Sequence, residues 1–126
     1  MHHSKLEKIF IDCADETTEA SAHFWSNALG MAPKRPTDAG SPYLSLTGRV
    51  GTLEVGLQRV NASSRFHLDI ETDDVEAEVR RLEKLGARRK ALIETWWVME
   101  DPSGLLFCVV EQYSEDFVAH ANVWDE

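Results

Sequence analysis

One succession of sequence patterns occurs twice in this chain, and it constrains the fold more than any other feature. Each copy begins with an apolar, alternating stretch typical of a β-strand, continues with a helical pattern, and closes with short strand-like stretches. The helical patterns end at Leu29-Gly30 and Leu85-Gly86. Two copies are too few to stack into a solenoid. We therefore expect a paired α+β arrangement within one domain.

In the first copy, a helix is expected between Asp15 and Leu29. The polar side chains of Asp15–Thr18 supply N-cap oxygens, and Gly30 ends the helix. Helical spacing with Ala20 and Ala28 places Phe24 in the core, and Trp25 is expected there too because large aromatic side chains mostly fill interiors. The expected strands of this copy are Leu6–Ala14, Ala32–Arg35, Tyr43–Leu46 and Thr52–Arg59.

In the second copy, Asp73-Asp74 caps a helix that carries Val75, Val79, Leu82 and Leu85 at helical spacing. Asp101–Gly104 is the tight turn between the last two strands. The expected strands are Ser64–Thr72, Arg88–Lys90, Ala91–Met99 and Leu105–Glu111.

These patterns predict one domain over residues 1–112, with modules of about 6–60 and 64–112. Residues 113–126 form a tail in which Phe117, Ala121 and Trp124 recur at helical spacing. We expect this tail to be helical and Trp124 to dock on its own domain or on a second chain, because an exposed Trp on a terminal arm is unfavourable.

The charge balance excludes two classes of partner. The 126 residues carry 22 acidic side chains against 13 Lys and Arg, a net charge of −9, so nucleic acid and anionic membranes are repelled. No apolar stretch approaches the roughly 20 residues that span a bilayer, and no signal-peptide pattern follows Met1–Lys5, so a cytoplasmic location is expected. Cys13 and Cys108 lie in apolar strand patterns typical of small buried thiols.

Three segments carry a resemblance to a known family: Phe24–Met31, Phe66–Glu78 and Trp97–Gly104. With their spacing, the chain resembles the vicinal oxygen chelate superfamily, the glyoxalase and bleomycin-resistance fold, in its glyoxalase-like domain branch. The resemblance implies two βαβββ modules that form a curved, cup-shaped mixed sheet with helices on the outer face. It does not choose a function, because this superfamily hosts dioxygenases, isomerases, epoxide-opening transferases and drug binders.

Strand alternation predicts which side chains face the cup, because neighbours along a strand point to opposite faces. Apolar residues are expected under the helices, and their polar neighbours in the cup. The set expected under the helices is Ile9, Ile11, Cys13, Leu53, Val55, Leu57, Phe66, Leu68 and Ile70. The set expected in the cup is Lys8, Phe10, Asp12, Glu54, Gly56, Gln58, His67, Asp69 and Glu71.

The resemblance places the family's metal-ligand positions on Lys8, on Glu54 or Gln58, on His67 and on Cys108. A protonated Lys8 donates only and cannot ligate a cation, and Cys108 stands where the family has a carboxylate. If a metal were bound, His67, Glu54 and Cys108 would form a set acceptable to zinc, but the charge of Lys8 would oppose it. We therefore expect no metal cofactor and keep a divalent metal as the alternative.

Without a metal, the same residues can bind a small organic ligand. Lys8 near His67, Asp69 and Glu54 would bind a carboxylate or a hydroxyl, and His67 is a possible general base. Phe10, Tyr43 and one of the adjacent Trp96 and Trp97, with Trp97 favoured, would supply an apolar wall. The expected ligand pocket is lined by Lys8, Phe10, Asp12, Tyr43, Glu54, Gln58, His67, Asp69, Trp97 and Cys108.

Three hypotheses follow for function. The preferred one is a small-molecule-binding protein of the bleomycin-resistance type with a non-metal pocket. The alternative is a lyase or isomerase that depends on a divalent cation, and a further alternative is a partner-binding domain without a ligand. Trp96 and Trp97 are adjacent in a strand, so one of them faces away from the cup, and this Trp together with the tail favours a homodimer.

Overall fold

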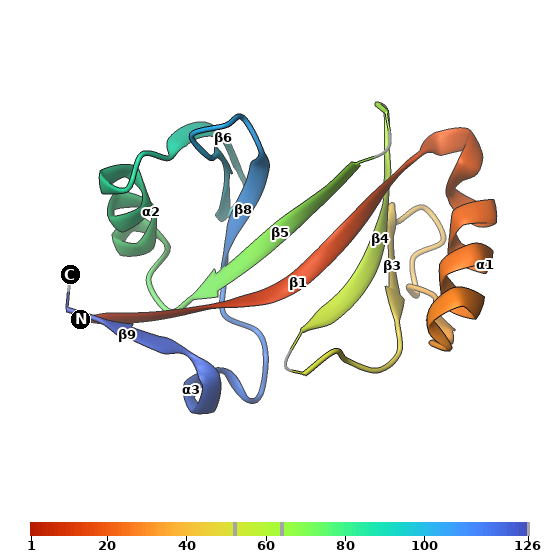
Figure 1. Ribbon diagram of the computed structural model, residues 1–126, viewed down its shortest axis with the longest axis horizontal. Coiled ribbons are helices and arrows are strands. Elements are labelled where there is room, and N and C mark those ends of the chain that lie inside the picture. Colours follow the sequence, from red (N-terminus) through yellow and green to blue (C-terminus); the bar gives the residue numbers. More distant parts are fainter. Residues whose placement is uncertain (52, 64, 126) are drawn as a thin grey trace. The chain divides into compact units, whose positions relative to one another are not determined.

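The computed structural model describes residues 1–51, 53–63 and 65–125. Thr52 and Ser64, where two of the expected strands begin, and Glu126, the last residue of the tail, lie outside these ranges. The described residues form nine strands, three α-helices and one 3-10 helix, and the order strand, helix, three strands occurs twice (Figure 1). The α+β class and the repeated βαβββ order are confirmed.

The chain divides into two compact units, one formed by Lys8–His67 and the other by Met1–Glu7 with Leu68–Glu126. Strand β1 (His2–Ala14) begins four residues earlier than expected and contributes to both units. Strand β5 (Arg65–Thr72) also passes from one unit into the other. Each unit is described by itself below.

In the Lys8–His67 unit, the second half of β1 pairs in parallel with β4 (Glu54–Val60). Strand β3 (Tyr43–Leu46) runs antiparallel to β4, and β2 (Pro33–Lys34) runs antiparallel to β3. The helical elements are η1 (Asp15–Thr17) and α1 (Thr18–Leu29). The register sets Lys8 opposite Glu54, Phe10 opposite Gly56 and Asp12 opposite Gln58.

The core of this unit lies between α1 and the sheet, as alternation predicted for Cys13, Val55 and Leu57, but Phe66, which was expected under the helices, is 57% exposed. The buried members are Cys13, Ala22, Leu44, Leu46, Val55 and Leu57, with Ile11, Trp25 and Met31 packed against them. Burial raises the pKa of the Cys13 thiol, which makes it a poor nucleophile.

Helix α1 corrects two expectations. Phe24 is 60% exposed rather than in the core, because Ala22 and Trp25, three residues apart, share the buried face of the helix. The hydroxyls of Thr17 and Thr18 donate to the carbonyl oxygen of Ala14 at 2.9 and 3.1 Å, so neither caps the helix as an acceptor. Gly30 ends the helix as expected, at a left-handed φ of 66°.

In the other unit, the second part of β5 pairs in parallel with β8 (Leu106–Glu111). Strand β7 (Trp96–Glu100) is antiparallel to β8, and β6 (Arg88–Ile93) is antiparallel to β7. Helix α2 (Val75–Lys84) begins as predicted, because the carboxylate of Asp74 accepts the backbone N–H of Ala77 at 3.0 Å. The core consists of Val79, Met99, Phe107 and Val109, with Leu68, Ile70, Val75, Leu82, Ala87 and Trp97 against it.

The expected strand Ala91–Met99 is wrong, because the chain reverses in its middle. Ile93 pairs with Trp96 across a two-residue turn, and Glu94 has a positive φ of 53°. Such hairpin turns are marked by Gly or Asn when they are visible in a sequence, and neither is present here. The other predicted turn is correct: Oδ1 of Asp101 accepts the N–H groups of Ser103 and Leu105, both at 2.8 Å.

The two ends of the described chain form a terminal clasp, which we define as His2–Ser4 paired with β9 (Asn122–Trp124) (Figure 1). Within the described part of the tail, residues 113–125, α3 (Phe117–His120) is the one helix. Trp124 docks on its own unit: its indole N–H donates to Oγ of Ser4 at 2.8 Å, and the guanidinium of Arg81 lies 3.8 Å from its ring centroid.

Buried carboxylates hold the clasp and the tail in place. Both Nε2 of His2 and the guanidinium of Arg81 lie 2.8 Å from Oε1 of Glu78. Burial acts to raise the pKa of Glu78, but hydrogen bonds from Arg81, His2 and Ser4 outweigh it, so this pKa lies below its usual range. Fully buried Glu71 accepts the backbone N–H groups of the first two tail residues, Tyr113 and Ser114, at 3.1 and 3.3 Å.

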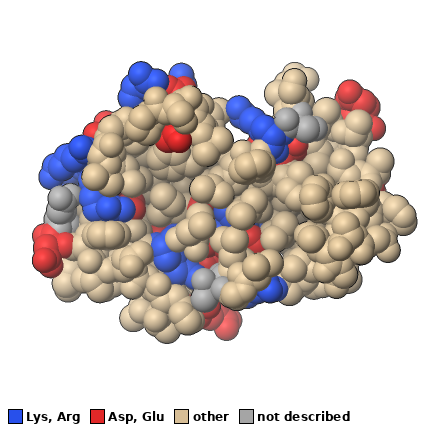
Figure 2. All heavy atoms as spheres, viewed as in Figure 1, with Lys and Arg blue, Asp and Glu red and all other residues tan. Residues whose placement is uncertain are grey.

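Lys and Arg side chains gather over α2 and β6 on the face shown in Figure 2. They have acidic partners: Arg89 contacts Glu76 and Glu83 at 2.8 and 3.0 Å, and Arg88 and Lys90 both pair with Glu100. This basic stretch is therefore a paired, solvated surface. None of the helices in the described ranges has the length and apolar character needed to cross a membrane.

Candidate functional site

A cluster of polar and aromatic side chains surrounds Phe10 on the face of β1 opposite α1, within the Lys8–His67 unit. Phe10 is 7% exposed. Its ring stacks on the imidazole of His67, with centroids 4.9 Å apart and planes 21° apart, and lies 5.8 Å from the ring of Tyr43. The ammonium of Lys8 is 4.6 Å from the Phe10 centroid, within cation–π range. We call this set the Lys8 cluster; it comprises Lys8, Phe10, Asp12, Tyr43, Ser45, Glu54, Gly56 and His67.

His67 is oriented by a buried carboxylate. Its Nδ1 lies 2.8 Å from Oδ2 of Asp12, which is 1% exposed, and Nε of Arg65 lies 3.6 Å from the same oxygen. Oδ1 of Asp12 is buried and has no hydrogen-bond partner among the residues described. A carboxylate at Nδ1 fixes the ring orientation and tautomer, so that Nε2 is the atom that would accept a proton or bind an ion.

Lys8 lies across the neighbouring strands β3 and β4. Its Nζ donates to Oγ of Ser45 at 3.3 Å and is 3.9 Å from Oε2 of Glu54. Arg49 approaches the other oxygen of Glu54 at 3.0 Å. A Cβ built on Gly56 would come within 2.6 Å of Cε of Lys8. The stem of Lys8 therefore occupies the space that any other residue at position 56 would fill.

The structure brings together six of the expected pocket residues in this cluster: Lys8, Phe10, Asp12, Tyr43, Glu54 and His67. Gln58 stands opposite both Asp12 and Tyr43 in register. Sequence reasoning missed Ser45, Arg49 and Arg65. Two of these carried a usable signal, because Ser45 is two residues from Tyr43 and Arg65 is two residues from His67, and so each shares a strand face with a predicted residue.

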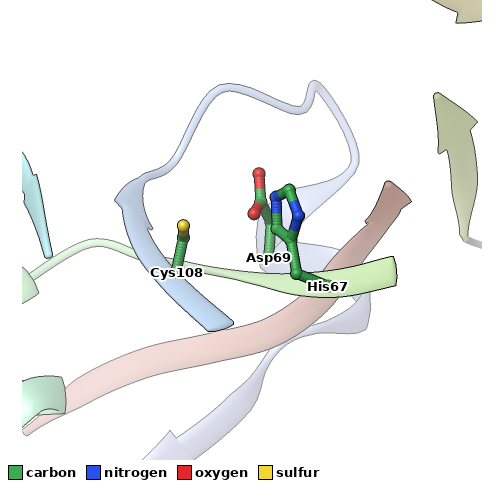
Figure 3. Close-up of side chains that lie close together, drawn as sticks. All are labelled: His67, Asp69 and Cys108. Atoms are coloured by element: carbon green, nitrogen blue, oxygen red, sulfur yellow. The ribbon is translucent and has the colours of Figure 1, made fainter. Parts of the chain in front are cut away.

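Strands β5 and β8 carry side chains of the kinds that bind divalent metals (Figure 3). Asp69 and Cys108 are opposite each other in register, and His67 precedes Asp69 by two residues on the same face of β5. One ligand atom from each of the three lies within 4.8 Å of the others. Nitrogen, oxygen and sulfur donors suit zinc, and the Asp12 carboxylate behind His67 is a common second contact of such ligands. The residues present therefore fit a divalent metal.

Two expectations about the site are corrected. The carboxylate beside His67 and Cys108 is Asp69 rather than Glu54, because Glu54 pairs with Lys8 and Arg49. Trp97 packs against the core under α2, with the guanidinium of Arg89 4.9 Å from its ring centroid. Because neighbouring side chains in a strand point to opposite faces, Trp96 rather than Trp97 lies on the face of β7 that is turned away from this core.

An open hollow of about 440 Å³ lies elsewhere in the Lys8–His67 unit. It is lined by Ala14, Asp15, Glu16, Val60, Asn61, Ala62 and Ser63, none of which was an expected pocket residue.

The family of this chain is decided by a match over most of its length. A family model described as glyoxalase-like domain matches residues 8–110. The chain belongs to this family. The matched range of the glyoxalase-like domain contains every residue of the Lys8 cluster, whereas the two segments of the terminal clasp, His2–Ser4 and Asn122–Trp124, lie outside it.

Solved structures share the fold of this glyoxalase-like domain at low identity. A hypothetical protein from Bacillus halodurans C-125 aligns with a TM-score of 0.63 and 13% identity, covering 89% of this chain and 96% of that one. A methylmalonyl-CoA epimerase from Mycobacterium tuberculosis gives 0.55 and 17%, covering 87% and 89%. A Streptomyces coelicolor methylmalonyl-CoA epimerase variant in complex with 2-nitronate-propionyl-CoA gives 0.55 and 14%, covering 87% and 98%. The comparison with curated proteins finds no match.

Proposed function

We propose that this glyoxalase-like domain binds a small organic molecule against the Lys8 cluster, in the manner of a bleomycin-resistance-type protein and without a metal. The observation that carries the proposal is the stack of His67 on Phe10 beside the largely buried ammonium of Lys8. Small-molecule sites combine aromatic surface with a few placed polar groups of this kind. The solved neighbours whose printed names include CoA ligands are consistent with a fold that accepts small molecules.

The test is a thermal-shift screen against metabolites and antibiotics, followed by repeat measurements on variants. A ligand at about 100 times its Kd should stabilise the protein by roughly 2.7 kcal/mol. Tyr43→Ala removes an aromatic neighbour of Phe10 and should reduce the shift, whereas Tyr113→Ala removes an exposed Tyr of the other unit and should not. A screen without any hit at millimolar concentrations would refute the proposal and favour the partner-binding alternative.

His67 is proposed as a general base for a ligand that carries an acidic proton. Asp12 at Nδ1 would hold the ring so that Nε2 faces the proton to be moved. Turnover of the ligand that the screen identifies would show that the protein is an enzyme.

A second candidate function, a metal-dependent lyase or isomerase, is favoured by the donor set of His67, Asp69 and Cys108. A divalent cation there would polarise a substrate oxygen. Titration with Co²⁺ tests it, since a cobalt–thiolate bond has its own charge-transfer absorption. That absorption should be present in the unaltered protein and lost in Cys108→Ser, whereas His23→Ala should leave it unchanged. Elemental analysis of protein prepared without chelator gives an independent measure of the metal content.

We also propose a cytoplasmic location and a homodimer. Cys13 and Cys108 form no disulfide within the described residues, in keeping with a reducing compartment. Exposed apolar side chains such as Leu85 and Val118, at 68% and 78% exposure, offer surface for self-association. Sedimentation velocity over a range of concentrations measures the oligomeric state.

A further inference from the structure

We infer that the ligand of the Lys8 cluster carries a singly charged anionic group, a carboxylate, attached to an aromatic ring. Lys8 and Ser45 would bind the carboxylate, and the ring would lie against Phe10 and Tyr43. The inference deepens the proposed function and depends on it.

The ammonium of Lys8 uses only part of its hydrogen-bonding capacity within the described residues. The side chain is only 12% exposed, and an ammonium has three donors. Within the described residues it makes one hydrogen bond, to Ser45 at 3.3 Å. Its distance of 3.9 Å to Glu54 is an ion pair but too long for a direct hydrogen bond. A largely buried cation with unused donors favours an acceptor from outside the chain.

Positive charge exceeds negative charge next to the Lys8 ammonium. Glu54 is shared by two cations, and the guanidinium of Arg49, at 3.0 Å, is closer to it than Lys8 is. Asp12 is likewise contacted by His67 and by Arg65. Beside Nζ of Lys8, two permanent cations, Lys8 and Arg49, therefore share the one carboxylate of Glu54, although the whole chain carries a charge of −9. A site with a small positive excess suits a single negative charge, whereas a doubly charged phosphate would also be repelled by Glu54 and Asp12.

Gly56 leaves the space in which the Lys8 side chain lies. A Cβ at this position would lie 2.6 Å from Cε and 3.2 Å from Nζ of Lys8, and 3.1 Å from Cε1 of Phe10. The glycine is thus required for space: it lets the ammonium lie beside the aromatic ring. Any anion that contacts Nζ is then next to the ring of Phe10, whose centroid lies 5.8 Å from that of Tyr43, which is why the anionic group is expected on an arene.

The experiment compares benzoate with its neutral analogue benzamide, using the full chain labelled with ¹⁵N and chemical-shift titrations. Benzoate should bind, with the largest shifts at Lys8, Ser45 and Gly56, and benzamide should bind at least about tenfold more weakly. Lys8→Met should remove this preference, and Lys34→Met, which changes an exposed Lys on β2, should keep it. Gly56→Ala is a second test, to be used if Lys8→Met does not fold. It displaces the ammonium without removing it and should weaken benzoate binding about tenfold.

Equal binding of benzoate and benzamide, an unchanged benzoate Kd in Lys8→Met, or tighter binding of inorganic phosphate would each overturn the inference. If the thermal-shift screen still gives neutral hits that depend on Tyr43, the proposed function stands while this inference fails. If neither benzoate nor any compound of the screen binds, both fail.

Discussion

Nδ1 of His67 lies 2.8 Å from Oδ2 of Asp12, although 55 positions separate the two residues in the chain. The side chains are 11% and 2% exposed, so the pair is nearly removed from water. It joins the beginning of β5 to the end of β1 within one compact unit. The same contact that would orient a functional imidazole therefore also stabilises the fold.

Asp12→Ala should destabilise the protein strongly. The substitution leaves the buried Nδ1 of His67 without its hydrogen-bond partner, and the expected loss is roughly 1–3 kcal/mol in the free energy of unfolding. The matched control is Asp15→Ala, whose carboxylate pairs with Arg59 at 3.2 Å on the surface and should change stability by about 0.5 kcal/mol or less. Urea denaturation measures both. Equal losses for the two variants would show that the buried pair contributes no more to the free energy of unfolding than the surface pair.

Trp124→Ala should loosen the terminal clasp. The substitution removes the hydrogen bond to Ser4 and the contact with Arg81, and should lower stability by roughly 1–3 kcal/mol. The amides of His2–Ser4 should then exchange faster with deuterium, since β9 is their antiparallel partner. Val123→Ala, on the same strand but 55% exposed, is the control and should leave exchange nearly unchanged. Unaltered protection in Trp124→Ala would mean that the clasp is held by its backbone pairing alone.

The repeated module could be predicted from sequence because its signals are local. Strand alternation, the Asp74 cap and the two glycines that follow the helices each depend on neighbouring residues. Alternation also grouped Lys8, Phe10 and Asp12 on one face of β1, which is how the structure has them. What alternation could not supply is register, because the pairing of strands depends on contacts between distant residues.

Where the sequence reading failed, two local preferences competed. Phe24 and Trp25 are adjacent on one helix, and only packing decides which of them is buried. The turn at Glu94 contains no residue that favours a positive φ, so Ala91–Met99 reads as a single strand. The terminal clasp was missed because its partners, His2–Ser4 and Asn122–Trp124, are both short and far apart in the sequence. Three-residue strands have too little periodicity to be recognised.

Glu71→Gln should release the start of the tail. The fully buried carboxylate accepts the N–H groups of Tyr113 and Ser114 and also the hydroxyl of Ser114. An amide has one acceptor oxygen and an NH₂ group, so at least one of these donors would face another donor, a loss of roughly 1–3 kcal/mol. Hydrogen exchange should increase over residues 113–120. Glu111→Gln, at an exposed position of β8, is the control; a similar increase there would contradict a specific role for Glu71.

Acid should weaken the terminal clasp through Glu78 and Asp73. At Asp73, burial acts to raise the pKa, but hydrogen bonds from the backbone and side chain of His3 outweigh it, so the pKa of this carboxyl, like that of Glu78, lies below its ordinary value. The ordinary values are 3.8 for Asp73 and 4.5 for Glu78. Because the unfolded chain takes up these protons first, the stabilisation is complete above the ordinary values and is lost as the pH falls through the lower folded-state values.

The measurement is urea denaturation from pH 7 to pH 3 at constant ionic strength, with Glu78→Gln beside the unaltered chain. At pH 7 the variant should be the less stable protein, because the ion pair of Glu78 with Arg81 is lost and its hydrogen bond with His2 is weakened. The difference should shrink as the pH falls below about 4.5, since the unfolded unaltered chain then takes up the proton, and it should vanish once the pH is below the lower folded-state pKa of Glu78. Glu115→Gln removes one exposed charge and should track the unaltered protein at every pH. A gap between Glu78→Gln and the unaltered chain that stays constant down to pH 3 would show that the clasp does not depend on the ionised carboxylate.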